Sequence, residues 1–181
     1  MRTLIGVVAA LLVVPVVLPE KHLAVFILLV LAAIVVAGLS LLMGYAGQVS
    51  LGQASFYAIG AYTAGLLSTH GTAPILGLLA APVVAATAAF LIGLPLLRLR
   101  GHALAFATLA MQLILLSLLS KGDWAGGAIG LQGVPRLSVG GFEFREDVEY
   151  AYLAVAALAV TLVVTRHLID SRAGRGLRAL A

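Results

Sequence analysis

The stretch from Leu23 to Met43 runs for 21 residues without a charged side chain, and nearly all of its residues are apolar. A helix that crosses the hydrocarbon core of a bilayer needs about 20 such residues. In lipid the backbone polar groups must be satisfied within the segment, which a helix achieves. The chain is 10% charged, whereas soluble domains carry roughly 25% charged residues. The stretch therefore predicts a transmembrane helix in an integral membrane protein.

Several other segments of the chain have the same apolar character. With the stretch above, the predicted spans are Leu4–Leu18, Leu23–Met43, Ala54–Ser68, Ile75–Leu97, Ala103–Ser120 and Ala151–Thr165. The first of these also fits a signal peptide, but no A-x-A-like cleavage site follows it, which favours an uncleaved helix. We expect an all-α integral membrane protein, a bundle of about six transmembrane helices in one domain over residues 1–181.

A segment rich in glycine and glutamine separates the second span from the third. It runs from Gly44 to Gln53 and is poor material for a helix that faces lipid, because glycine loosens a helix and an amide side chain in hydrocarbon needs a partner. We therefore expect an irregular or re-entrant segment before the third helix. Two interpretations remain open: non-helical backbone lining a transport route, which membrane proteins tolerate, or a simple cytoplasmic hairpin.

The third span carries a row of small residues on one side. Ala54, Ala58, Ala61 and Gly65 recur at helical spacing and share one face. Small residues let two membrane helices approach closely. This row is the predicted helix-packing face.

The segment that begins at Gly44 resembles the signature of the membrane permeases of branched-chain amino acid ABC importers. The signature G-Y-x-G-Q-x-S-L-G-(H/Q)-A-x-F-x-x-I-G-A-Y-x-x-A is matched by Gly44, Tyr45, Gly47, Gln48, Ser50, Leu51, Gly52, Gln53, Ala54, Phe56, Ile59, Gly60, Ala61, Tyr62 and Ala64. Residues 95–112 and Gly126–Pro135 resemble two further blocks of the same family. A match of this length is specific.

The resemblance implies a permease subunit without a cofactor. It would work with a homologous permease subunit, cytoplasmic ATPase subunits and a periplasmic amino-acid-binding protein, in a bacterial inner membrane. Related permeases serve urea and short amides, so these substrates stay open. The residues predicted to line the translocation route are Gly44, Gly47, Gln48, Ser50, Gly52, Gln53, Thr108 and Gln112. For Gln112, near the middle of the fifth span, an interhelical hydrogen bond is the alternative to a pore-lining role.

The basic tail after the last span has two interpretations. From the residues alone, it is an anchor that meets anionic membrane lipid. The resemblance implies instead the start of a cytoplasmic loop that docks on the ATPase. The predicted docking residues are Ser171, Arg172, Gly174, Arg175 and Arg178. Members of the family continue beyond this loop, so we expect the chain to correspond to the N-terminal portion of such a permease.

The distribution of basic residues predicts the orientation of the chain. If the N-terminus is cytoplasmic and the spans alternate, seven basic residues lie inside and four lie outside. Cytoplasmic loops carry the excess of lysine and arginine. The N-terminus and the basic tail are therefore expected on the cytoplasmic side, and the acidic section between Lys121 and Glu149 outside.

The sequence offers no chemistry of its own. There is no P-loop motif, no cysteine, and no spacing of the four histidines that suits a metal. We expect no catalytic, cofactor or metal site, and no nucleic-acid partner. The spans also lack the ionisable groups that ion-coupled carriers use. A separate ATPase would supply the energy. The alternatives are a truncated, non-transporting subunit that only assembles with partners and, less favoured, a channel.

Overall fold

The computed structural model describes residues 2–45, 47–96, 99, 101–139 and 142–171. The chain divides into two compact units, Met1–Gly47 with Phe144–Ala181, and Gln48–Glu143. Each unit is described here by itself. A single transmembrane domain over residues 1–181 stays a prediction.

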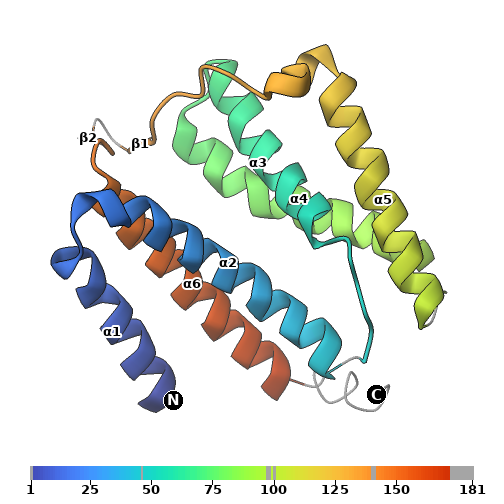
Figure 1. Cartoon of the computed structure of the whole chain (residues 1–181), viewed down its shortest axis with the longest axis horizontal. Coiled ribbons are helices and arrows are strands. Elements are labelled where there is room, and N and C mark those ends of the chain that lie inside the picture. The colour runs from blue at the N-terminus through green and yellow to red at the C-terminus, as the bar shows by residue number, and fades with distance from the viewer. Residues whose placement is uncertain (1, 46, 97–98, 100, 140–141, 172–181) are drawn as a thin grey trace. The chain divides into compact units, whose positions relative to one another are not determined.

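The first unit consists of three helices: α1 (Arg2–Val17), α2 (Glu20–Tyr45) and α6 (Asp147–Asp170). Helices α2 and α6 lie side by side and run in the same direction (Figure 1). This suits two helices that both descend from the same side of a membrane.

The core of the first unit follows from the helical spacing of large residues on α2. Leu23, Phe26 and Val30 fall on one face and are buried, with at most 8% of each exposed. They pack against α6, where alanines allow the close approach. The buried residues of α6 are Ala151, Ala154, Val155 and Leu158. At the start of α6 the Glu149 carboxylate accepts the backbone N–H of Glu146 at 3.3 Å, which satisfies a free donor of the first turn.

The second unit contains α3 (Gln53–Thr69), α4 (Pro74–Leu96) and α5 (His102–Lys121). Two short 3-10 turns follow, η1 (Asp123–Ala125) and η2 (Gly127–Ile129). A two-residue antiparallel pair, β1 (Ser138–Val139) with β2 (Phe142–Glu143), completes the unit. A turn at His70 and Gly71 folds α4 back along α3 (Figure 1).

Helices α3 and α4 meet through small residues on both sides. A β-carbon added at Gly77 of α4 would lie 2.8 Å from the Ala64 carbonyl oxygen and 3.1 Å from the Ser68 hydroxyl oxygen. One turn away, a β-carbon on Gly60 would lie 3.8 Å from the Ala81 carbonyl oxygen. At Gly77 the two backbones therefore approach too closely for a side chain, as in other membrane helix pairs.

Substitution of Gly77 with valine is expected to destabilise the second unit by about 1–3 kcal/mol, since an added side chain meets backbone atoms that cannot rotate away. Thermal unfolding in detergent, followed by circular dichroism, measures the effect. Gly93→Val is the matched control, because Gly93 lies on the same helix with nothing within 4 Å of its added β-carbon. Equal losses from the two variants would show that the close contact is unimportant.

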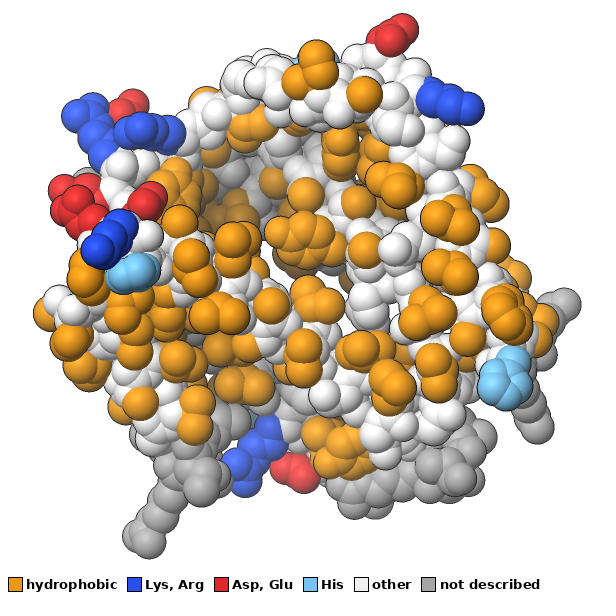
Figure 2. Space-filling view, viewed as in Figure 1, with side chains coloured by type: hydrophobic (Ala, Val, Ile, Leu, Met, Phe, Trp, Pro, Cys, Tyr) orange, Lys and Arg blue, Asp and Glu red, His pale blue; other side chains and the backbone are white. Residues whose placement is uncertain are grey.

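The outward faces of the helices are apolar. Leu28 on α2, Phe90 on α4 and Ile114 on α5 are each at least 66% exposed. Figure 2 shows hydrophobic side chains along the lengths of the helices, with charged side chains gathered near helix ends. Four helices, α2, α4, α5 and α6, are long and apolar enough to cross a membrane, and α1 and α3 are shorter, at 16 and 17 residues. The expected all-α membrane fold is confirmed.

The irregular segment before the third helix is also present, with shorter bounds than expected. Helix α2 continues through Gly44 to Tyr45, and Gln53 already belongs to α3. Residues 47–52 have no regular secondary structure, and Gly47 has a φ of 60°. A single glycine costs a helix only about 1 kcal/mol, so the long apolar run carries α2 past Gly44. Re-entrance of this segment into the membrane stays a prediction.

Candidate functional site

The polar contacts of the second unit concentrate where the irregular segment meets α5. The backbone N–H of Leu51 donates to the Thr108 hydroxyl at 3.0 Å, across 57 residues of sequence. The same hydroxyl donates its proton to the Ala105 carbonyl at 3.0 Å. Thr108 is only 4% exposed. One buried hydroxyl thus serves as acceptor for the segment before α3 and as donor within α5.

Glycine at position 52 permits this junction. A β-carbon there would lie 2.8 Å from the Met111 methyl carbon, 3.2 Å from Thr108 Cβ and 3.3 Å from the Thr108 carbonyl oxygen. The φ of Gly52 is −95°, which any residue can adopt. Space, and not backbone conformation, therefore requires glycine at this position.

Two serines flank the junction. Ser50 is buried, and its hydroxyl accepts the backbone N–H of Gly52 at 3.4 Å. Ser55, in the first turn of α3, is 2% exposed. Within the described residues its hydroxyl oxygen has no hydrogen-bond partner. A buried hydroxyl without a partner costs about 1–3 kcal/mol, so the start of α3 holds unused hydrogen-bonding capacity.

Substitution of Thr108 with valine is expected to lower the free energy of unfolding by about 1–3 kcal/mol, because the N–H of Leu51 loses its buried acceptor while the side-chain shape is kept. Chemical denaturation in mixed micelles measures the difference. Thr108→Ser retains the hydroxyl and is expected to recover most of the loss. A valine variant as stable as the wild type would contradict the proposed importance of this hydrogen bond.

The structure brings three of the predicted route residues together: Ser50, Gly52 and Thr108. Gln112 lies on α5 one turn beyond Thr108 and is half-buried, like Gln48 and Gln53. Within the described residues these three glutamine amides make no hydrogen bond. Gly44 and Gly47 belong to the other unit and are exposed. A role in lining a route stays a prediction for all eight residues.

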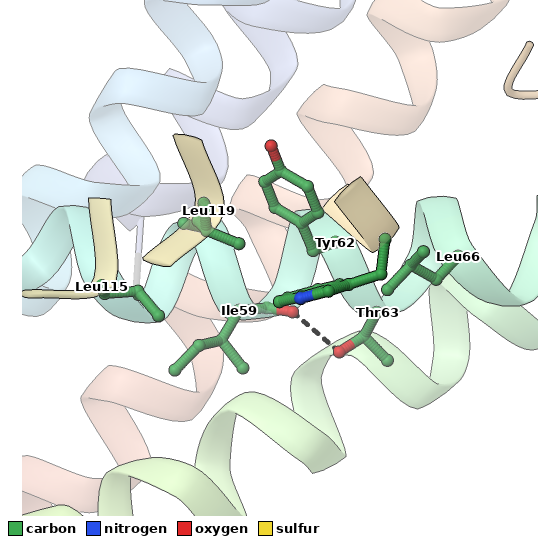
Figure 3. Close-up of a pocket in the computed structure, with 8 residues that line it drawn as sticks. Ile59, Tyr62, Thr63, Leu66, Leu115 and Leu119 are labelled. Carbon is green, nitrogen blue, oxygen red and sulfur yellow. Dashed lines mark hydrogen bonds between the residues drawn. The ribbon is translucent and has the colours of Figure 1, made fainter. Parts of the chain in front are cut away.

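A cavity of about 180 Å³ lies between α3, α5 and the 3-10 turn η1. Its wall includes Ala58 of α3 and Trp124 of η1, together with the labelled side chains in Figure 3. The Tyr62 and Trp124 rings pack edge to face, with centroids 6.3 Å apart and planes at 67°. Besides Ala58 and Trp124, the lining residues are Ile59, Tyr62, Thr63, Leu66, Leu115 and Leu119.

The glycine-rich loop that follows Trp124 packs against α3. Gly126, with φ 82° and ψ 10°, ends η1 directly after Trp124 and Ala125. Farther along, Leu131 packs on Gly65 so closely that an added β-carbon on Gly65 would lie 2.6 Å from a Leu131 methyl carbon. The loop is therefore fastened to α3 on both sides of its glycines.

The four residues of the predicted packing face of α3 lie in different environments. Gly65 contacts Leu131, and Ala58 lines the cavity. Ala54 and Ala61 are exposed, so their packing against another chain stays a prediction. The described contact with α4 uses the neighbouring row of small residues, Gly60, Ala64 and Ser68.

Sequence reasoning did not find the cavity or the Gly77 contact. The available signals were the single tryptophan of the chain and the spacing of four between the small residues Gly60, Ala64 and Ser68, and likewise between Gly77, Ala81 and Ala85. Of the predicted docking residues, Ser171 is described, and its hydroxyl donates to the Leu168 carbonyl at 2.6 Å. Arg172, Gly174, Arg175 and Arg178 lie outside the described residues.

The fold and the polar junction define a multi-pass helical membrane protein whose irregular segment is held against a spanning helix. The chain belongs to the family described as the branched-chain amino acid transport system / permease component, whose model matches residues 18–181.

Two curated relatives are similar to this chain. It is 40% identical over 114 residues to the high-affinity branched-chain amino acid transport system permease protein LivM of Escherichia coli. The aligned region covers 59% of this chain and 26% of that protein. It is 39% identical over 112 residues to the LivM protein of Salmonella typhimurium, covering 61% of this chain and 26% of that one. The match thus spans about a quarter of the length of these relatives. No solved structure matches the chain.

Proposed function

We propose that this chain forms part of the permease subunit of an ATP-driven importer of branched-chain amino acids. The observation that carries the proposal is the family match over residues 18–181, together with two relatives that bear this activity in their names. The polar junction of Leu51 with Thr108 supports it, because irregular backbone is tolerated at membrane depth only where it is buried in protein or lines a cavity.

The central parts of the spanning helices α2, α5 and α6 carry no charge, which supports ATP hydrolysis by another subunit, and not an ion gradient, as the source of energy. Ionisable residues of α2, α5 and α6 occur only at their ends, such as Glu20, Lys121 and Asp170. An ion-coupled carrier uses ionisable groups inside its spans. The permease part is therefore not an enzyme, and cytoplasmic ATPase subunits drive it.

The polar lining of the route consists of uncharged groups. The half-buried amides of Gln48, Gln53 and Gln112 are available to water or to the polar end of an amino acid, since they make no hydrogen bond within the described residues. Neutral amides offer both donors and acceptors without holding an ion tightly. Such a lining suits passage better than retention.

The remaining partners follow from this function. A homologous permease subunit completes the route, a periplasmic binding protein delivers the amino acid, and lipid covers the apolar outer faces. The N-terminus and the basic tail face the cytoplasm, in accordance with the excess of basic residues on that side. The tail from Ser171 through Arg178 docks on the ATPase. Co-purification with the ATPase in detergent, lost on Arg172→Glu with Arg175→Glu, tests the docking.

Uptake into proteoliposomes tests the function directly. The complete permease that contains this chain is reconstituted with its partner permease and ATPase, and labelled leucine is added with the binding protein. Uptake is expected to require ATP on the ATPase side and to continue when a proton ionophore is present. Replacement of ATP by a non-hydrolysable analogue is the control and should abolish uptake.

Two results would contradict the proposal. Uptake that an ionophore abolishes in the presence of ATP would indicate ion coupling. Uptake of labelled urea or a short amide in place of leucine, isoleucine and valine would indicate the related substrate class. Each result is distinct from an inactive preparation, because ATP hydrolysis by the complex is measured in the same vesicles.

A further inference from the structure

The cavity between α3, α5 and η1 has the chemistry of a site for an aliphatic group. Leu66, Leu115 and Leu119 present branched hydrocarbon to it (Figure 3). Tyr62 and Trp124 add aromatic rings to the lining. The only other polar side chain of the lining is Thr63, whose hydroxyl proton is donated to the Ile59 carbonyl at 2.7 Å. The wall therefore offers dispersion contacts and little competition from bound water.

The size of the cavity suits a small branched group. Apolar cavities of about 150 Å³ admit a molecule as large as benzene, and this cavity measures about 180 Å³. A four-carbon side chain enters such a space with room for part of the amino acid backbone at its mouth.

One charge of each sign lies close in sequence to residues that line the cavity. Lys121 ends α5 two residues after Leu119, and Asp123 opens η1 directly before Trp124. Both are exposed, and within the described residues neither forms an ion pair. An amino acid carries one ammonium and one carboxylate group, so this pair of charges matches its polar end in a way that it does not match a hydrocarbon.

We propose that this cavity receives the branched side chain of the amino acid, while Asp123 and Lys121 attract its ammonium and carboxylate groups. The proposal rests on the proposed function and deepens it by locating a recognition site on this chain. In the predicted orientation, the C-terminal ends of α3 and α5 face the outer side, where a binding protein releases its cargo. The cavity then acts as an outer selection site for aliphatic side chains.

The single tryptophan of the chain makes the test direct, since Trp124 lines the cavity and reports alone. The 181-residue chain is placed in lipid nanodiscs, and its fluorescence is titrated with leucine, isoleucine, valine and alanine. A saturable change is expected with the branched amino acids. Alanine lacks three carbons of leucine and should bind roughly 60-fold more weakly, because each buried methylene contributes about fourfold.

Substitutions separate the side-chain site from the charged mouth. Ala58→Leu fills the cavity and should weaken leucine binding at least about tenfold. Ala110→Leu adds the same atoms at an exposed position of α5 and should leave binding unchanged. Lys121→Gln with Asp123→Asn should weaken leucine binding by up to about fivefold, as for exposed charges. The same pair should leave the binding of uncharged isoamyl alcohol unaltered.

Several outcomes would overturn the proposal. One is that leucine causes no change in fluorescence. Another is that leucine causes a change which the Ala58→Leu substitution does not weaken. A response to long-chain alcohols but not to leucine would assign the cavity to a lipid acyl chain. If the complete importer transports leucine while this chain shows no response, the proposed function stands and the cavity proposal alone fails.

Discussion

Replacement of Gly126 with alanine is expected to open the glycine-rich loop and to release Trp124 from the cavity. Gly126 combines a φ of 82° with a contact that leaves no room, since an added β-carbon would overlap the carbonyl oxygen and carbonyl carbon of Gly130. Both are backbone atoms, so the loop itself must move. Left-handed backbone costs other residues about 1–2 kcal/mol, and the overlap adds to this cost.

The expected consequence is a loss of at least about 2–3 kcal/mol of stability in the loop and a shift of Trp124 emission as the indole leaves the Tyr62 ring. Gly71→Ala separates the two causes. Gly71 has a similar φ of 86° with nothing within 4 Å of an added β-carbon. Its substitution should cost only the backbone strain and leave the tryptophan spectrum unchanged. An unshifted spectrum in the Gly126 variant would show that the loop does not position Trp124.

Replacement of Gly52 with valine is the second large effect, and it acts at the junction with α5. The added methyl groups would overlap Met111 and approach Thr108, whose hydroxyl accepts the Leu51 N–H. Overpacking of this kind costs about 1–3 kcal/mol, and displacement of the segment also breaks the hydrogen bond, for about 1–3 kcal/mol more. We expect reduced thermal stability and strongly reduced transport by the complete permease.

A compensating substitution tests the cause of this effect. The nearest atom to the added β-carbon of Gly52 is the terminal methyl of Met111, a flexible group. Met111→Ala should therefore restore part of the stability lost in Gly52→Ala, with a coupling of about 0.5–3 kcal/mol in a double-mutant cycle. Gly38→Val, at a position with nothing within 4 Å, controls for valine in place of glycine. Strictly additive losses would contradict a direct clash.

The helical architecture was predictable from sequence because long apolar runs allow few alternatives in a membrane. The run from Leu23 to Met43 became the centre of α2, and the glycine-rich segment produced a break. The ends were less accurate: α2 passes Gly44, and α6 extends beyond Ala151–Thr165 to Asp147 and Asp170. Where a helix ends depends on local capping, such as the hydrogen bond from the Glu146 backbone N–H to the Glu149 carboxylate. Hydropathy does not report such contacts.

The site was predictable only in part. Thr108 and Gly52 were both singled out by their positions, but their contact depends on how α5 approaches the irregular segment. The packing of α3 shows the same limit. Two rows of small residues run along this helix, and either one permits close approach, so hydropathy alone cannot decide which row meets α4. The cavity arises from three separate elements and has no local signature at all.

The pairing of α2 with α6 has a consequence for how the protein is made. Leu23, Phe26 and Val30 share a core with buried residues of α6, which are synthesised roughly 120 residues later. At a synthesis rate of about 5–20 residues per second, this interval lasts about 6 to 24 seconds. During that time the whole Gln48–Glu143 unit emerges and inserts first. The face of α2 that ends up buried must therefore be sheltered by lipid, by α1 or by the insertion machinery until the last helix arrives.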